Sequence, residues 1–345
     1  MKIKLLIKKI IETLQSLVLP LCSVMPITSS LFFTFFSRDF YYEHQAILKA
    51  RLKYSKSNGQ HGRSSALLRR NIHRIEKGLV MRPRRNVFAL DYLSETLSAF
   101  NSAMNHSNFS RSEQQWAIDV LSEYFSVVDL TQATIKKNYH LFKSIIVNTQ
   151  ITDKKPYQYK DKVCHNVHYD QLFALTQARR STRWFTNQAV ELEQIKLAVK
   201  VALQAPSACN RQPYQFYMID EQPLLGQLAS LPGGTAGFAD NIPSLIAVVG
   251  DLSYYPYTRD RHVIYIDASL ASMQFMLALE TIGLSSCPIN WPELYTLDKK
   301  VSKLLGLPQY KRVVMFIAVG YPDLTGQIAF SDKKVPDDMV VKVKA

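Results

Sequence analysis

The sequence predicts an α+β fold in which a central mixed sheet is flanked by helices and preceded by an all-helical N-terminal region. Residues 66–147 show the apolar spacing of successive helices, and after residue 190 helical segments alternate with runs rich in aromatic and β-branched residues. A polar, charged stretch at residues 152–162 separates the two patterns. The 345 residues, of which 47% are hydrophobic, are enough for one large or two modest cores.

The first pattern contains helices and breaks in regular order. Residues 55–65, SKSNGQHGRSS, are expected to form a loop, and a helix over residues 66–79 is expected to end at Gly78 through a left-handed conformation. Further helices are predicted around residues 88–104, 113–128 and 133–147.

The second pattern predicts helices over residues 191–204 and 265–282, the latter stopped by Gly283. Strands are predicted where aromatic and β-branched residues gather, at residues 214–220, 244–251 and 312–322. These elements divide the chain into an N-terminal segment (residues 1–55), a helical domain (residues 56–151) and an α+β domain (residues 163–340).

Positive charge is concentrated at the N-terminus. Residues 1–86 contain 17 Lys and Arg against 4 Asp and Glu, which accounts for +13 of the chain's net charge of +14. Residues 1–18 have the pattern of a basic amphipathic helix, and Pro20 and Pro26 interrupt the uncharged run that follows, which disfavours a spanning helix. We therefore expect residues 1–86 to contact an anionic membrane surface, with the protein cytoplasmic and peripheral on the inner membrane face; packing of the first helix on the main domain is the alternative.

Other classes of partner are disfavoured. The aromatic and basic interleaving of a single-strand nucleic-acid platform is absent, which argues against nucleic acid as the partner. The four cysteines form no CxxC pair and have no metal-like spacing with histidines, so we predict free thiols, a reducing compartment and no metal site.

Two polar motifs stand out in the α+β domain. Residues 179–185, RRSTRWF, place three arginines within five residues beside small hydroxyl groups, a combination suited either to a phosphate held at close range or to a solvated surface. Residues 205–213, APSACNRQP, offer donors and acceptors between a helix and a strand. They could be satisfied by a planar heteroaromatic ligand or by the turn's own backbone.

In this order, the two motifs and the elements that follow resemble the flavin-dependent nitroreductase family over about residues 169–338. The resemblance implies a nitroreductase-like fold and an FMN-binding homodimer with the flavin at the subunit interface. It implies that the first motif holds the FMN phosphate and ribityl end and that the second binds the flavin ring. A C-terminal basic residue would add to the phosphate site. The residues implied are Arg179, Arg180, Ser181, Arg183, Ser207, Asn210, Gln212, Pro288, Ile289, Asn290, Lys333 and Lys334.

One segment departs from the family's pattern. After the helix predicted to end at residue 282, the family presents a small, Gly-rich loop over the reactive face of the flavin, whereas this chain has SSCPINWPE, with Asn290 and Trp291 in place of glycines. Trp291 is expected either to stack on flavin or substrate or to fill the core. Cys209 and Cys287 are candidates to border the same site, although buried cysteines usually only pack.

The function that the resemblance implies is an FMN-dependent oxidoreductase that passes electrons from NAD(P)H through flavin to a small organic acceptor. No Gly-x-Gly-x-x-Gly follows any predicted strand, so the nicotinamide is expected to bind only transiently, on the flavin. Two alternatives remain open: an FMN-dependent dehydrogenase or tailoring enzyme of a biosynthetic pathway, and a non-catalytic flavin-binding module at a membrane-associated assembly. No catalytic acid or base is assigned.

Overall fold

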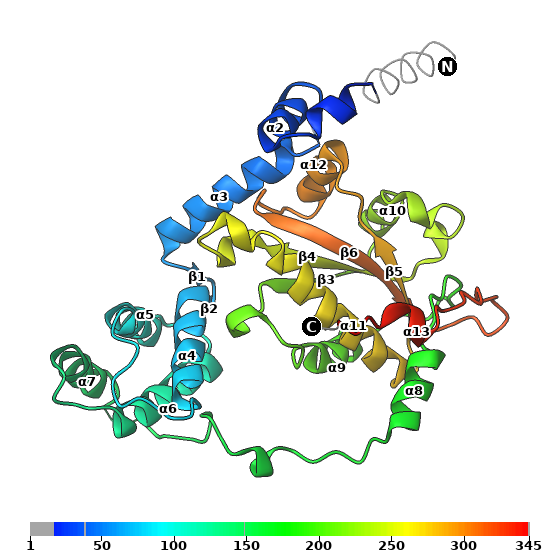
Figure 1. The fold of residues 1–345 in the computed structure, drawn as a ribbon. Helices are drawn as coiled ribbons and strands as arrows, with labels where there is room; N and C mark the ends of the chain where they lie inside the picture. Colours follow the sequence, from blue (N-terminus) through cyan, green and yellow to red (C-terminus); the bar gives the residue numbers. More distant parts are fainter. Residues whose placement is uncertain (1–16, 38, 148, 344–345) are drawn as a thin grey trace.

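The computed structural model describes residues 17–37, 39–147 and 149–343 (Figure 1). Most of the predicted N-terminal amphipathic helix lies outside these residues. The helices are α2 (Pro26–Phe35), α3 (Tyr41–Ser57), α4 (Ala66–Leu79), α5 (Leu93–Met104), α6 (Arg111–Val127), α7 (Ala133–Ile145), α8 (Tyr169–Ala178), α9 (Leu192–Ala202), α10 (Leu224–Ala229), α11 (Val263–Glu280), α12 (Tyr295–Leu304) and α13 (Pro336–Met339). The strands are β1 (Gln60–His61), β2 (Ser64–Ser65), β3 (Tyr214–Ile219), β4 (Ser244–Asp251), β5 (Ser285–Asn290) and β6 (Lys311–Gly320).

The predicted α+β class is confirmed, and the central sheet has the strand order β3-β4-β6-β5. All three strand pairs are antiparallel, so the expected mixed character is limited, in the described residues, to one parallel bridge between Ser181 and Ser286. Every residue of β4 is buried, because alternate side chains enter cores on the two faces of the sheet. Helices α9 and α11 cover one face, and α10 and α12 cover the other.

Helix α11 is the longest helix of the α+β domain. Residues 258–280 are the one described helical segment long and apolar enough to cross a membrane, yet half of its apolar window is buried inside the protein. Phe275 and Leu279 are fully buried in the core that α11 shares with α9 and the sheet. The helix ends before Gly283, whose φ of +78° fits the stop predicted there.

Helices α4 to α7 gather around a separate core at one side of the molecule, and the segment after α7 runs from there to α8 (Figure 1). Helix α3 crosses the predicted boundary between residues 55 and 56, because it continues to Ser57. Its Ala46, Ile47 and Ala50 pack against Leu252, Tyr255 and Ile264 of the α+β domain. Of the loop expected over residues 55–65, residues 55–57 belong to α3, and the rest forms a short connection and the β1–β2 hairpin.

Two further local predictions are wrong. Residues 285–290, predicted as a loop, form edge strand β5, which accepts Pro288 because an edge strand pairs on one side only. Gly78 does not end α4 through a left-handed conformation, since the helix continues to Leu79. A Cβ atom at Gly78 would lie 2.3 Å from Phe88 Cε2, so glycine is required there by close packing.

Candidate functional site

The arginine-rich motif lies along the free edge of the sheet. Helix α8 ends at Ala178, and the chain then extends beside β5, where the Thr182 amide donates to the Ser286 carbonyl at 3.1 Å. Farther along, the Phe185 amide donates to Asn241 Oδ1 at 2.7 Å. These contacts fix the backbone of residues 181–185, which carries Arg183, whereas the Arg179 amide is fixed at the end of α8 by its hydrogen bond to the Leu175 carbonyl.

Arg179 is the best available anion ligand of the motif. Its Nε and Nη1 atoms are buried and have no hydrogen-bond partner in the part of the chain that the structure describes. Its positive charge opposes the rise that burial causes in the pKa of Glu280 at the end of α11. A guanidinium with two unused, desolvated donors is suited to a phosphate or carboxylate group.

The other basic residues predicted for the phosphate differ in their surroundings. Arg180 donates to the backbone carbonyls of Ala329 (2.9 Å) and Phe330, so its guanidinium holds the C-terminal segment. Arg183 is exposed and lies over the Phe238 ring at 5.9 Å. Lys333 and Lys334 are exposed and follow Phe330, which brings their segment to this end of the sheet; among the described residues neither lysine makes a hydrogen bond or ion pair with the motif.

A cavity of about 630 Å³ opens beside Arg183 and the outer edge of β5. Pro288 and Asn290 are exposed on β5, whereas the Ile289 side chain points into the core, so Ile289 offers a ligand mainly its backbone. Cys287 also borders the cavity. Burial raises the pKa of its thiol, with Arg183 and Ser181 opposing the shift, which disfavours the thiolate that a nucleophilic cysteine requires.

Trp291 has a structural role. Its side chain is 4% exposed, meets the Phe316 ring edge-on and donates from Nε1 to Asp298 Oδ1 at 2.9 Å. It is not among the residues that line the cavity beside β5. The substitution of tryptophan for glycine therefore leaves this cavity open, and of the two expectations for Trp291 the packing one holds.

The second motif forms a strained loop held by groups on other elements. Cys209, Asn210 and Gln212 all have φ near +50°, which is uncommon for residues other than glycine. Ser207 Oγ donates to Asp267 Oδ2 on α11 at 2.6 Å and accepts from the Gln212 amide at 2.8 Å. The loop therefore satisfies part of its own backbone, which agrees with the interpretation that the turn itself satisfies the polar groups of this motif.

Arg69 on α4 holds the same loop from the other side. Its Nε donates to the Asn210 carbonyl at 2.7 Å, and its Nη2 donates to Gln212 Oε1 at 3.2 Å. The third nitrogen, Nη1, pairs with Glu113 at 3.2 Å. A single side chain of the N-terminal half thus links α6 to the predicted flavin loop.

The structure does not bring the two motifs together within one chain. Ser207 contacts α11 at Asp267, near the start of the helix, whereas Arg179 lies near Glu280, where the helix ends. The helical rise places these two carboxylates about 20 Å apart along α11. A ligand that uses both motifs therefore needs groups from two places in the fold.

Sequence reasoning missed Asp267 and Arg69. Asp267 carries a signal, because it is a buried carboxylate inside a long and largely apolar helix, and burial raises its pKa against the hydrogen bonds from Ser207 and Ala208. Arg69 carries none, since it is one of several arginines in a basic helix and only the tertiary structure shows which of them reaches the loop.

Comparisons with known proteins find one matching family model and several similar proteins. The model of the Nitroreductase family matches residues 176–230 and 221–321. An iodotyrosine deiodinase of Thermotoga neapolitana is 28% identical over 176 residues, which cover 44% of this chain and 89% of that protein. A putative NADH dehydrogenase/NAD(P)H nitroreductase of Archaeoglobus fulgidus is 28% identical over 181 residues, which cover 51% and 99%. Among solved structures, an FMN-dependent nitroreductase of Clostridium difficile is 26% identical and covers 50% of this chain and 99% of its own, with a TM-score of 0.43.

Proposed function

We propose that this protein, whose C-terminal half is a nitroreductase-family domain, is an oxidoreductase that binds FMN and passes electrons from NAD(P)H to a small organic acceptor. The observation that carries the proposal is Arg179, whose two buried, unpartnered nitrogens fit the FMN phosphate. Once bound, FMN supplies the chemistry by accepting hydride and passing electrons on.

The protein's own residues bind and orient. Arg179 neutralises the phosphate, and the Ser181 hydroxyl, on the segment fixed against β5, donates to it. Asn210 and Gln212 bind the flavin ring from the strained loop, whose geometry is set by Arg69 and Asp267. Pro288, Ile289 and Asn290 bound the cavity where the acceptor enters.

We place the flavin between two copies of the chain. The motifs lie near opposite ends of α11, at carboxylates about 20 Å apart along the helix, which supports this, because the Arg179 end of one copy can meet the Asn210 loop of the other. An exposed apolar surface supports it too: Leu197 and Val201 on α9 and Ile266, Leu270 and Met273 on α11 are each at least 40% exposed. Neighbouring apolar residues at this exposure are typical of subunit interfaces.

A mixing experiment tests the shared site. Arg179→Ala and Asn210→Ala are each expected to bind FMN weakly as homodimers. After the two variants are unfolded and refolded together, mixed dimers regain one intact site, and strong FMN binding returns to about a quarter of the sites present, because half of the dimers are mixed and each has one intact site of two. If mixing restores no binding, the site does not lie between subunits.

The first functional test is an absorbance spectrum of the purified protein after FMN reconstitution, followed by anaerobic NADPH and NADH. We expect a bound flavin spectrum that bleaches, and reoxidation by an acceptor from a panel of a quinone, a nitroaromatic compound and an iodotyrosine, since relatives are named nitroreductases and iodotyrosine deiodinases. Absence of flavin binding would contradict the proposal. A bound flavin that NAD(P)H does not reduce would favour the dehydrogenase alternative.

We also propose that the N-terminal segment places the enzyme on an anionic membrane surface, cytoplasmic and on the inner face. Large apolar side chains are exposed in residues 17–36, which follow the Lys-rich start of the sequence. They are Leu17, Leu19, Leu21, Val24, Met25, Ile27, Leu31, Phe35 and Phe36. Apolar groups that enter the headgroup region, next to lysines, are the pattern of an interfacial anchor. Cosedimentation with anionic but not with zwitterionic vesicles is expected, and equal recovery with both would contradict it.

A further inference from the structure

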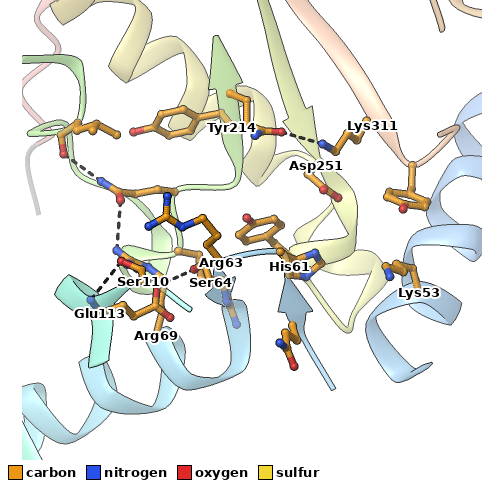
Figure 2. Close-up of a pocket in the computed structure, with 18 residues that line it drawn as sticks. Lys53, His61, Arg63, Ser64, Arg69, Ser110, Glu113, Tyr214, Asp251 and Lys311 are labelled. Carbon is orange, nitrogen blue, oxygen red and sulfur yellow. Dashed lines mark hydrogen bonds and ion pairs between the residues drawn. The ribbon is translucent and has the colours of Figure 1, made fainter. Parts of the chain in front are cut away.

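A second cavity lies where the N-terminal half meets the α+β domain. Its volume is about 760 Å³. The N-terminal half contributes the end of α3, the β1–β2 hairpin and α4 to its walls, and the α+β domain contributes β3, the end of β4 and the start of β6. Figure 2 shows Lys53, His61, Asp251 and Lys311 on one side of it, and Ser64, Arg69, Ser110 and Glu113 on the other. This volume is typical of small-molecule sites.

The lining is basic, with five cationic side chains and two carboxylates. Both carboxylates already have partners: Glu113 accepts from Ser64, the Ser65 amide and Arg69, and Asp251 accepts from Ser253. Lys53, Arg63 and Lys311 have no carboxylate within 4 Å among the described residues. Lys311 donates to two neutral oxygens, on Gln215 and Tyr217.

Two of these cations come from different halves of the chain and line the same side of the cavity (Figure 2). Burial lowers the pKa of His61, the Asp251 carboxylate opposes this shift, and the positive charges of Lys53 on α3 and Lys311 on β6 lower the pKa further; all four residues line the cavity. Like charges held near one another repel, and an anion between them removes this cost. Arg63, on the turn between β1 and β2, is exposed at the same cavity.

The cavity also presents aromatic surface and unused polar groups. The His61 ring stacks on the Tyr254 ring, with centroids 4.1 Å apart and planes 15° apart. Tyr214 lines the cavity and is 7% exposed; its hydroxyl, like His61 Nε2, is buried without a hydrogen-bond partner among the described residues. Buried polar groups are normally satisfied, so these two atoms indicate a missing partner.

We propose that this cavity binds a phosphorylated small molecule with a planar ring, its phosphate held by Lys53, Arg63 and Lys311 and its ring lying against the His61–Tyr254 stack. The phosphate comes either from the NAD(P)H donor or from a separate ligand. Neither Lys53 nor Lys311 belongs to the proposed FMN site, although Gln212 of that site lines the same cavity; binding of a phosphate here can be measured without flavin turnover, and only the NAD(P)H alternative rests on the proposed function.

The test uses FMN-saturated full-length protein and two probes, inorganic pyrophosphate and adenosine 2′,5′-bisphosphate, titrated calorimetrically at about 0.15 M salt, where attraction between distant exposed charges is screened. Lys53→Gln/Lys311→Gln is expected to weaken binding of both probes about tenfold or more, since each lost charge-assisted hydrogen bond is typically worth about a factor of ten. The control Lys299→Gln/Lys300→Gln removes the same charge from exposed positions on α12 and is expected to leave binding unchanged.

A second variant guards against a folding defect in the first. Arg63→Gln changes one exposed side chain and is expected to weaken pyrophosphate binding on its own. Competition of the bisphosphate with NADPH in steady-state kinetics would identify the donor as the source of the phosphate, and binding without competition would identify a separate ligand. The proposal fails if neither probe binds, or if the α12 control weakens binding as much as the cavity variants.

Discussion

Arg179→Ala is the sharpest test of the proposed flavin site. Two nitrogens of the Arg179 guanidinium are buried without a partner in the described part of the chain, so the full strength of their hydrogen bonds is available to a phosphate. A hydrogen bond to a charged group contributes about 1.5 to 3 kcal/mol. At about 1.4 kcal/mol per tenfold, loss of the Arg179 contact raises the Kd of FMN by about 10 to 150 times.

Arg180→Ala is the matched control, because it removes the same charge from the next position. The Arg180 guanidinium is already committed to the carbonyls of Ala329 and Phe330, so its loss is expected to change the Kd of FMN by less than about threefold, the weak effect typical of an exposed charge. Both constants are measured by quenching of FMN fluorescence on titration with apoprotein. If Arg179→Ala leaves the Kd unchanged, or if both variants weaken binding equally, the assignment of Arg179 to the phosphate is wrong.

Three further predictions concern the architecture around the site. Asp298→Asn is expected to destabilise the protein by about 3 to 5 kcal/mol, because it leaves the buried Arg312 without its buried partner. Glu293 is a 43% exposed partner of the same arginine, so Glu293→Gln should cost less than about 1 kcal/mol. Thermal unfolding of both variants checks this. Burial of Asp119 raises its pKa, but hydrogen bonds from Thr152 and Lys154 outweigh that effect, so the net pKa is lowered. The Asp119 carboxylate therefore stabilises the fold above its unfolded pKa of about 3.9, and this contribution is lost as pH falls through the native pKa. The difference in unfolding free energy between wild type and Asp119→Asn should therefore shrink below about pH 4, and a pH-independent difference would contradict this assignment. Gly78→Ala should cost about 1 to 3 kcal/mol through the clash with Phe88, although alanine is the better helix former, and a stabilised variant in urea unfolding would refute the packing argument.

The parts of the fold that the sequence predicted well are those with a strong local signal. Strand β4 was predicted at its observed bounds because its eight residues form a buried apolar run, and α11 was predicted to within two residues at each end because its length and the following glycine are unambiguous. Strand β5 was missed because Ser285–Asn290 contains a proline and little apolar periodicity. It is a strand only because β6 offers an edge to pair with.

The candidate site likewise has features that the sequence predicted and features that depend on the tertiary structure. The two motifs are local in sequence and were found there, as were Pro288 and Asn290 at the exposed face of β5. Their separation along α11 could not be predicted, because it depends on which ends of one helix the two segments contact. The basic cavity under the N-terminal half depends on Lys53 and Lys311, which are 258 positions apart and have neighbours of no distinctive pattern.

The N-terminal half is therefore structurally part of the proposed flavin site. Residues other than glycine with positive φ cost roughly 1 to 3 kcal/mol each and persist only where neighbours hold them, and the loop of residues 207–212 contains three of them. Asp267 holds one end of this loop from within the α+β domain, and Arg69 holds the other from α4. Arg69, which fixes Asn210 and Gln212, also lines the basic cavity and pairs there with Glu113, so this cavity and the loop share one side chain. Helix α4 therefore adds, through Arg69, a second set of contacts to a strained loop that the α+β domain holds through Asp267 and the Leu203 carbonyl.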